Sequence, residues 1–270
     1  MGPSRRRKHR FLKIFLVLIA LAGGLGVAAE SRYAVMRIAD ISVRPRGDIL
    51  SSETVWGLVS EREEAFWPYL WAAKKSYEKA LEEYYPVKVR MKLVGWGKFE
   101  LETTYLQPLY RLFWDNKYWY VSQDGKVWLA TLDMNKWLNL DEVMRKPVLT
   151  WGEVRTTPVD MASEDGNVYV SSLPIARIRG WYENIELLGW SGYVKFIQAG
   201  KREGISVVRL IFKDAQGGNG ADVLFPDDPV LWQEPGLAIK KIYPDAAKLP
   251  PEIFIDTTYK GKILVRNKVQ

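Results

Sequence analysis

Apolar and polar residues follow a different pattern in each part of the chain, and the longest uncharged run comes first. The segment "IFLVLIALAGGLGVAA", residues 14–29, carries no charge, and Phe11 and Leu12 extend it across Lys13, whose side chain can snorkel at a helix end. Because about 20 apolar residues span a bilayer, residues 11–29 are predicted to form a single transmembrane helix. The basic tail of residues 1–10 would then stay in the cytoplasm by the positive-inside rule.

A cleavable signal peptide is the alternative interpretation of this segment. Val27-Ala28-Ala29 fits the small-residue pattern of a cleavage site, and nearby glycines weaken the end of a helix. Both interpretations export the rest of the chain. We prefer the uncleaved anchor.

Residues 33–105 have the pattern of a small module with helices and a sheet. The predicted elements are a strand in residues 34–43, a short serine-capped helix in residues 51–61, a helix from Pro68 to the residue before Pro86, and strands in residues 87–93 and 99–102. Apolar residues in these last two strands alternate with Lys and Arg in the first and with Glu in the second. The sheet is therefore predicted to have one apolar face toward the helices and one charged face toward solvent.

From residue 106 onward the pattern changes to short aromatic strands, which predicts a mostly antiparallel β domain. Asp124-Gly125 and Asp165-Gly166 are hairpin signals, and residues 204–213, "GISVVRLIFK", are the clearest strand. Residues 173–196 are predicted to hold a helix or a helix pair. The chain closes on a hairpin in residues 252–270, which turns at Lys260-Gly261, so the whole fold is predicted to be α+β.

Composition excludes several classes of chemistry. The chain has no cysteine and a single histidine, His9, which lies in the basic tail. The rest of the chain therefore has no imidazole or thiol for nucleophile activation, general-base catalysis or zinc ligation. We expect no catalytic site, no metal site and no cofactor.

The net charge of +7 is concentrated at the start of the chain. Residues 1–13 hold six of the 39 basic residues and no acidic one, which leaves 33 basic against 32 acidic residues. A nearly neutral body lacks the basic face that binds phosphates, so we expect no nucleic-acid role.

Aromatic residues make up 13% of the chain, which raises the possibility of sugar binding. We expect them to fill a thin sheet core instead, because no cluster of polar residues accompanies them to bind hydroxyl groups. Adjacent carboxylates such as Asp227-Asp228 and Glu82-Glu83 rarely reach the facing geometry of a glycosidase. No small-molecule substrate is therefore expected.

Several segments, in their order along the chain, resemble the bacterial cell-division family FtsQ/DivIB. The segments are "VMRIADISVRPRGDILSSETVWGLV", "LEEYYPVKVRMKLV" and "KFELETTY", then "QPLYRLFWDNKYWYVSQDGKVW", "KPVLTWG" and "IDTTYKGKILVR". The pattern departs from the family at Tyr105-Leu106, where Glu-Arg is usual, and at Thr257 and Thr258, where Leu and Arg are usual. Residues 138–200 align poorly.

The resemblance implies a POTRA domain in residues 33–105 and a β domain in residues 106–270. It implies a non-catalytic scaffold of the inner membrane, with its bulk in the periplasm, which is enriched at the division septum and binds single-span partners such as FtsB and FtsL. The last strands would form the partner surface. The residues expected there are Ile255, Thr257, Thr258, Tyr259, Lys262, Ile263, Leu264, Val265 and Arg266.

A terminal strand suits this role because one row of its backbone groups is free to pair with a partner strand. Lys262, Arg266 and Lys268 would favour an acidic partner. One alternative is an outer-membrane assembly factor, although residues after the first module lack the evenly spaced strands of a barrel. Another is an exported enzyme or carbohydrate-binding protein released by signal peptidase, which the mass of the mature protein would distinguish.

Overall fold

The computed structural model describes residues 17, 36–45, 50–151, 158–160 and 166–268. The predicted transmembrane segment, residues 11–29, lies outside these residues except for Val17. Among the residues described, none of the helices combines the length and the apolar character needed to cross a bilayer. The chain divides into two compact units: unit 1 comprises residues 1–82 and 87–104, and unit 2 comprises residues 83–86 and 105–270.

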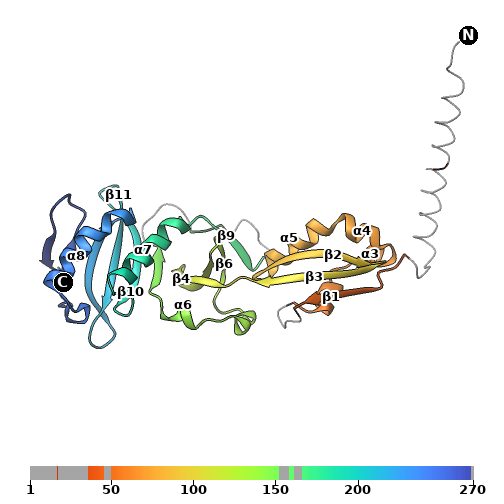
Figure 1. The fold of residues 1–270 in the computed structure, drawn as a ribbon, viewed down its shortest axis with the longest axis horizontal. Coiled ribbons are helices and arrows are strands. Elements are labelled where there is room, and N and C mark those ends of the chain that lie inside the picture. The colour runs from red at the N-terminus through yellow and green to blue at the C-terminus, as the bar shows by residue number, and fades with distance from the viewer. Residues whose placement is uncertain (1–16, 18–35, 46–49, 152–157, 161–165, 269–270) are drawn as a thin grey trace, which may run out of the picture. The chain divides into compact units, whose positions relative to one another are not determined.

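Unit 1 contains a three-stranded sheet in the order β1-β3-β2 (Figure 1). Its strands are β1 (Asp40–Arg44), β2 (Val87–Gly95) and β3 (Lys98–Tyr105). β1 runs parallel to β3, and Ile41 is paired with Phe99. The alternation predicted from sequence is confirmed, since every second residue of β2 and β3 is buried over most of their length.

Four short helices connect β1 to β2. They are α2 (Ser52–Trp56), α3 (Glu61–Ala65), α4 (Trp67–Ala72) and α5 (Lys74–Tyr84). α2 begins at the predicted serine cap, where the Ser51 hydroxyl accepts from the N–H of Thr54. α3 was not predicted, although Ser60 and Glu63 form a capping box at its start. The single helix predicted from Pro68 is divided at Ala73, whose N–H is shared between the carbonyls of Tyr69 and Trp71.

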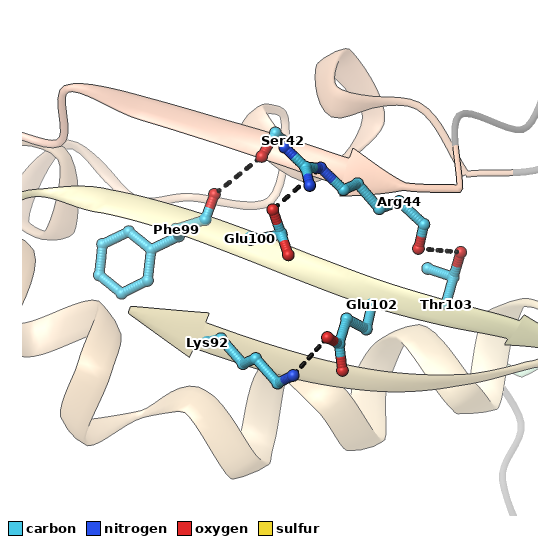
Figure 2. Close-up of polar contacts among 7 residues, drawn as sticks. All are labelled: Ser42, Arg44, Lys92, Phe99, Glu100, Glu102 and Thr103. Carbon is cyan, nitrogen blue, oxygen red and sulfur yellow. Dashed lines mark hydrogen bonds and ion pairs between the residues drawn. The ribbon is translucent and has the colours of Figure 1, made fainter. Parts of the chain in front are cut away.

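The face of this sheet opposite the buried side chains of β2 and β3 is polar (Figure 2). Arg44 Nε lies 2.9 Å from Glu100 Oε2, and Lys92 forms an ion pair with Glu102. This is the charged, solvent-facing side that the strand pattern predicted.

Unit 2 is built on an eleven-stranded, mostly antiparallel sheet. Its strands are β4 (Pro108–Trp114), β5 (Lys117–Ser122), β6 (Lys126–Leu129), β7 (Val148–Trp151), β8 (Val159–Asp160), β9 (Val168–Ser171), β10 (Val194–Arg202), β11 (Ile205–Lys213), β12 (Asn219–Pro226), β13 (Ile253–Asp256) and β14 (Leu264–Asn267). Their order is β14-β13-β12-β11-β10-β7-β4-β5-β6-β9-β8. Only the β4/β7, β7/β10 and β12/β13 pairs are parallel among the strands described.

The helices of unit 2 lie between these strands along the chain. They are η1 (Asp133–Trp137), α6 (Asp141–Arg145), α7 (Ile175–Leu187), η2 (Pro229–Trp232), α8 (Gln233–Ile242) and η3 (Ala246–Lys248). Ile178 and Trp181 of α7 and Ile239 of α8 pack into one core with strand residues such as Leu210 and Val223. Both long helices therefore pack against the same side of the sheet.

Several strand predictions are confirmed in unit 2. The hairpin at Asp124-Gly125 joins β5 to β6, and residues 204–213 contain β11. Asp165 lies outside the described residues. The helix predicted within residues 173–196 is a single helix, α7, and the end of that segment enters β10. The largest fully buried side chains of the unit are tryptophans and phenylalanines, so aromatic residues do fill the core.

Candidate functional site

The closing strand β14 lies at one end of the large sheet and pairs with β13 alone among the strands that the structure describes. The two strands are antiparallel, with Phe254 opposite Arg266 and Asp256 opposite Leu264. The predicted closing hairpin is therefore present. Its connection is longer than a tight turn because β13 ends at Asp256 and β14 begins at Leu264.

The hydrogen-bond pattern of this pair tells which backbone groups face outward. The N–H of Lys268 donates to the carbonyl of Glu252 over 2.6 Å, and the N–H of Thr257 donates to Leu224 of β12 over 3.0 Å. Along an antiparallel pair, the backbone N–H and C=O groups of successive residues point alternately toward the partner strand and away from it. The register then directs the N–H and C=O groups of Val265 and Asn267 away from β13, toward the open edge.

The side chains of β14 are exposed along the whole strand. Leu264 and Val265 expose 46% and 50% of their surface, and they project to opposite faces because neighbouring strand residues alternate. The Arg266 guanidinium lies 4.8 Å from the centre of the Phe254 ring. The edge therefore offers two apolar side chains and one cation beside its unpaired backbone groups.

A buried carboxylate fixes the chain where β13 ends. Asp256 forms an ion pair with Arg202 of β10, and it accepts hydrogen bonds from the Thr258 hydroxyl at 2.7 Å and N–H at 3.0 Å. Burial alone would raise the pKa of Asp256, but the hydrogen bonds from Thr258 and Arg202 outweigh it and lower that pKa. The hydrogen bond to Asp256 likewise raises the pKa of Arg202. This carboxylate therefore remains charged and holds the turn in place.

Thr257 and Thr258 have structural roles at the end of β13. The Thr257 hydroxyl donates to the carbonyl of Leu224 over 2.8 Å, which extends the contact between β13 and β12 beyond the last strand residue. The Thr258 hydroxyl donates to the Asp256 carboxylate, which caps the backbone N–H of Thr258. Both contacts fix the start of the connection that carries Tyr259.

A groove of about 520 Å³ lies between α8 and the connection from β13 to β14. It is lined by Pro226, Leu231, Glu234, Pro235 and Ala238, and by residues 257–263. Leu231 is 55% exposed, and Ile263 is partly buried and packs against the core. The groove is thus mainly apolar and reaches the beginning of the open strand.

Tyr259 lines both this groove and a second, smaller hollow. The hollow has a volume of about 160 Å³ and is also lined by Arg202, Ile205 and Val207. The Arg202 guanidinium carbon lies 5.9 Å from the centre of the Tyr259 ring, and the tyrosine is 45% exposed. A partner that occupies either hollow would contact this ring.

The charged residues around the edge are mostly basic. Lys260 and Lys262 line the groove together with the single acid Glu234. Lys268, which the sequence suggested as a contact for an acidic partner, lies 3.2 Å from the buried carboxylate of Asp222. Its charge is therefore compensated within the unit, and Lys260, Lys262 and Arg266 are the exposed basic residues beside the edge.

The structure brings the predicted partner-binding residues together but gives them different accessibility. Tyr259, Lys262, Leu264, Val265 and Arg266 are exposed. The side chains of Ile255 and Thr257 are 1% and 6% exposed, so they support the edge from beneath. Thr258 and Ile263 are partly buried and line the groove.

The contribution of α8 and η2 to the groove was not predicted from the sequence. Leu231, Pro235 and Ala238 are spaced like one face of a helix, and Asp228-Pro229 before them is a typical helix start. In the structure, the Asp228 carboxylate accepts from the N–H of Val230. This signal predicts a helix, but it does not predict that the helix faces residues 257–263.

The adjacent carboxylates considered in the sequence have structural contacts. Asp227 forms an ion pair with Arg177 of α7, and Asp228 caps η2. In unit 1, Glu82 accepts from the N–H of Val89. Within the described ranges, no cluster of three or more acidic or histidine side chains could hold a metal ion.

No protein-family model matches this chain, and no curated protein matches it.

Proposed function

We propose that this chain is a non-catalytic, membrane-anchored scaffold of the bacterial division machinery, similar in role to FtsQ/DivIB. In this proposal the chain sits in the inner membrane at the septum, with its bulk in the periplasm. It binds single-span partners of the FtsB and FtsL kind through the edge of β14. Unit 1 corresponds to the POTRA domain and unit 2 to the β domain of that family.

The observation that supports this proposal most strongly is the open edge of β14 beside an apolar groove. The outward N–H and C=O groups of Val265 and Asn267 can pair with a strand of any sequence, which provides affinity from the main chain. Alternate side chains of the added strand would meet Leu264 and Val265, and this provides specificity.

The chemistry of the surface defines the partner segment. It would be an extended segment that pairs with β14, followed by one apolar side chain that enters the groove between Leu231 and Ile263. Acidic residues on the segment would face Lys260, Lys262 and Arg266. The juxtamembrane end of a single-span protein is a suitable source, because it lies in the same compartment as unit 2 in this proposal.

The decisive experiment changes the main chain of β14 without changing its contact with β13. Val265→Pro removes an N–H that faces the open edge, and proline is tolerated at such positions in edge strands. Val265→Thr is the matched control, since it alters the side chain and keeps the N–H. We expect tagged native protein and Val265→Thr to co-purify small single-span proteins from membranes, and Val265→Pro to lose them.

Circular dichroism in the near ultraviolet would check that all three proteins are folded. Retention of the partners by folded Val265→Pro would show that strand addition at β14 is not the interaction. A mature chain that lacks the first 29 residues would instead favour the exported enzyme or carbohydrate-binding protein. Ile263 is a poorer site for this test because its side chain packs against the core.

A further inference from the structure

One end of unit 1 carries a group of apolar side chains, four exposed and one half-buried, that the proposed function does not use. We name this group the aromatic tip. It consists of Trp67, Trp71, Leu93, Val94 and Trp96. The last four are 36%, 37%, 55% and 61% exposed. Trp67 packs edge-to-face against Trp96, with ring centres 5.4 Å apart.

The tip is formed by α4 and by the turn between β2 and β3, which lie at the same end of the unit (Figure 1). Trp67 and Trp71 are four residues apart and so lie on one side of α4. Both rings lie near Phe99, with centres 6.3 and 6.4 Å away. The buried Phe99 ring therefore forms the base on which the exposed rings rest.

The chain enters unit 1 directly beside this tip. The N–H of Trp67 donates to the carbonyl of Met36 over 3.0 Å, and the N–H of Ala39 donates to the carbonyl of Gly97 over 2.8 Å. Gly97 has a φ of +66°, and a Cβ there would lie 2.6 Å from the carbonyl oxygen of Arg37. Glycine is therefore required for the entering chain to pack against the turn.

The position of this entry limits the distance between the tip and the predicted anchor. Residue 29 ends the predicted transmembrane segment, and Met36 is the seventh residue after it. A fully extended chain spans at most about 3.6 Å per residue, so the two points are at most about 25 Å apart. The headgroup layer adds roughly 5–8 Å to each side of the hydrocarbon core, and the tip is within reach of it.

We propose that the aromatic tip lies in the phospholipid headgroup region of the leaflet from which the chain emerges. Tryptophan is enriched at membrane interfaces, where its ring is apolar and its N–H is polar. Lys74, whose ammonium lies 4.2 Å from the centre of the Trp71 ring, is placed to contact lipid phosphates. The contact would restrict the orientation of unit 1 against the bilayer. This inference rests on the proposed membrane anchor.

The absence of cysteine from the chain allows a direct test. Val94→Cys places one thiol at the tip. Thr104→Cys places one thiol on the same sheet but away from the tip, six residues after the start of β3, and both positions are exposed. Each full-length variant is labelled with an environment-sensitive fluorophore and reconstituted in phosphatidylcholine vesicles. Some vesicles contain lipid brominated near the headgroup end of its acyl chains.

We expect the probe at Val94 to shift its emission to the blue and to lose fluorescence in brominated vesicles, and the probe at Thr104 to do neither. Trp96→Gln in the Val94→Cys background should weaken both changes. Carbonate extraction of the same vesicles tests separately whether the protein is anchored in the bilayer. Anchored protein whose Val94 probe behaves like the Thr104 probe would overturn the inference and leave the anchor intact. Protein that carbonate extracts would overturn the anchor and the inference together.

Discussion

β2 and β14 each lie at the edge of their own sheet, and their outward backbone groups are treated in opposite ways. In unit 1, the N–H groups of Val89 and Met91 donate to Glu82 Oε1 at 3.0 Å and to Glu78 Oε1 at 2.7 Å, and both acceptors belong to α5. In unit 2, the outward groups of Val265 and Asn267 have no strand beyond them among the residues described. One edge is closed by the protein itself and the other is open.

The difference shows that β2 and β14 do not share the same kind of edge. Exposed sheet edges promote aggregation, and proteins usually cover them or place charges on them. β2 has both protections, because carboxylates cap its N–H groups and basic side chains alternate along its outer face. β14 is short, and it keeps its apolar residues exposed. The edge of β14 is therefore the one of the two that remains available for pairing with another strand.

The largest effect is expected from Asp256, which fixes the end of β13 beside the open edge. Asp256→Ala leaves Arg202 without its carboxylate and removes the cap on Thr258. Loss of one partner of a buried ion pair costs about 3–5 kcal/mol, and we expect about 3 kcal/mol because Arg202 is 30% exposed. Urea unfolding would measure the loss, and capture of the single-span partners should fall with it.

A matched control for this variant exists in unit 1. Glu100 pairs with Arg44, which is 71% exposed, so Glu100→Ala should cost less than about 1 kcal/mol. It should not alter partner capture. An equal loss of stability for both variants would show that burial does not strengthen the Asp256 contact.

The closed edge can be opened by removing its two caps. Glu78→Ala and Glu82→Ala each leave one backbone N–H of β2 without its acceptor, and each should lower the free energy of unfolding by about 1.5 kcal/mol. Hydrogen exchange at Met91 and Val89 should quicken, and the double variant should self-associate as concentration rises. Analytical ultracentrifugation would detect this association.

Glutamine is the control because its amide oxygen can still accept the bond. Glu78→Gln with Glu82→Gln should stay monomeric under conditions in which the alanine variant associates. If the alanine variant also stays monomeric, the two carboxylates do not protect the edge of β2. The proposed difference between the edges of β2 and β14 would then be wrong.

Much of the secondary structure on both sides of this comparison could be predicted from sequence. Alternation with period two predicted β2, β3 and the closing hairpin, because a strand with one buried face must alternate. α3 was missed although "SERE" has the spacing of a capping box. The break at Ala73 has no sequence signal, since alanine favours helix.

The candidate site was less predictable for a physical reason. The groove depends on contacts between residues 226–238 and residues 257–263, which lie far apart in sequence. The outward direction of the Val265 N–H depends on the register between β13 and β14, which residue types alone do not define. The burial of Ile255 follows from its place on the face that packs against the helices.

The contribution of Asp256 should also depend on pH. Its pKa is lowered in the folded protein, because hydrogen bonds from Thr258 and Arg202 outweigh burial. A folded-state pKa below the unfolded value gives stability that is complete above the ordinary value of 3.8 and is lost as the pH falls through the folded value. The difference in unfolding free energy between native protein and Asp256→Asn should therefore shrink on going from about pH 6 to about pH 3. A constant difference would contradict this account.

The smallest effect is expected at the charged rim of the open edge. Lys262 is exposed beside the groove, so Lys262→Gln should weaken partner binding by less than about 1 kcal/mol. The effect should appear mainly in the association rate and should diminish as salt rises, because rim charges steer encounter and are screened. Surface plasmon resonance at low and high salt would measure it, with the exposed Lys75→Gln of unit 1 as control. A slower association for Lys75→Gln as well would show that net charge, and not the rim of the open edge, attracts the partner.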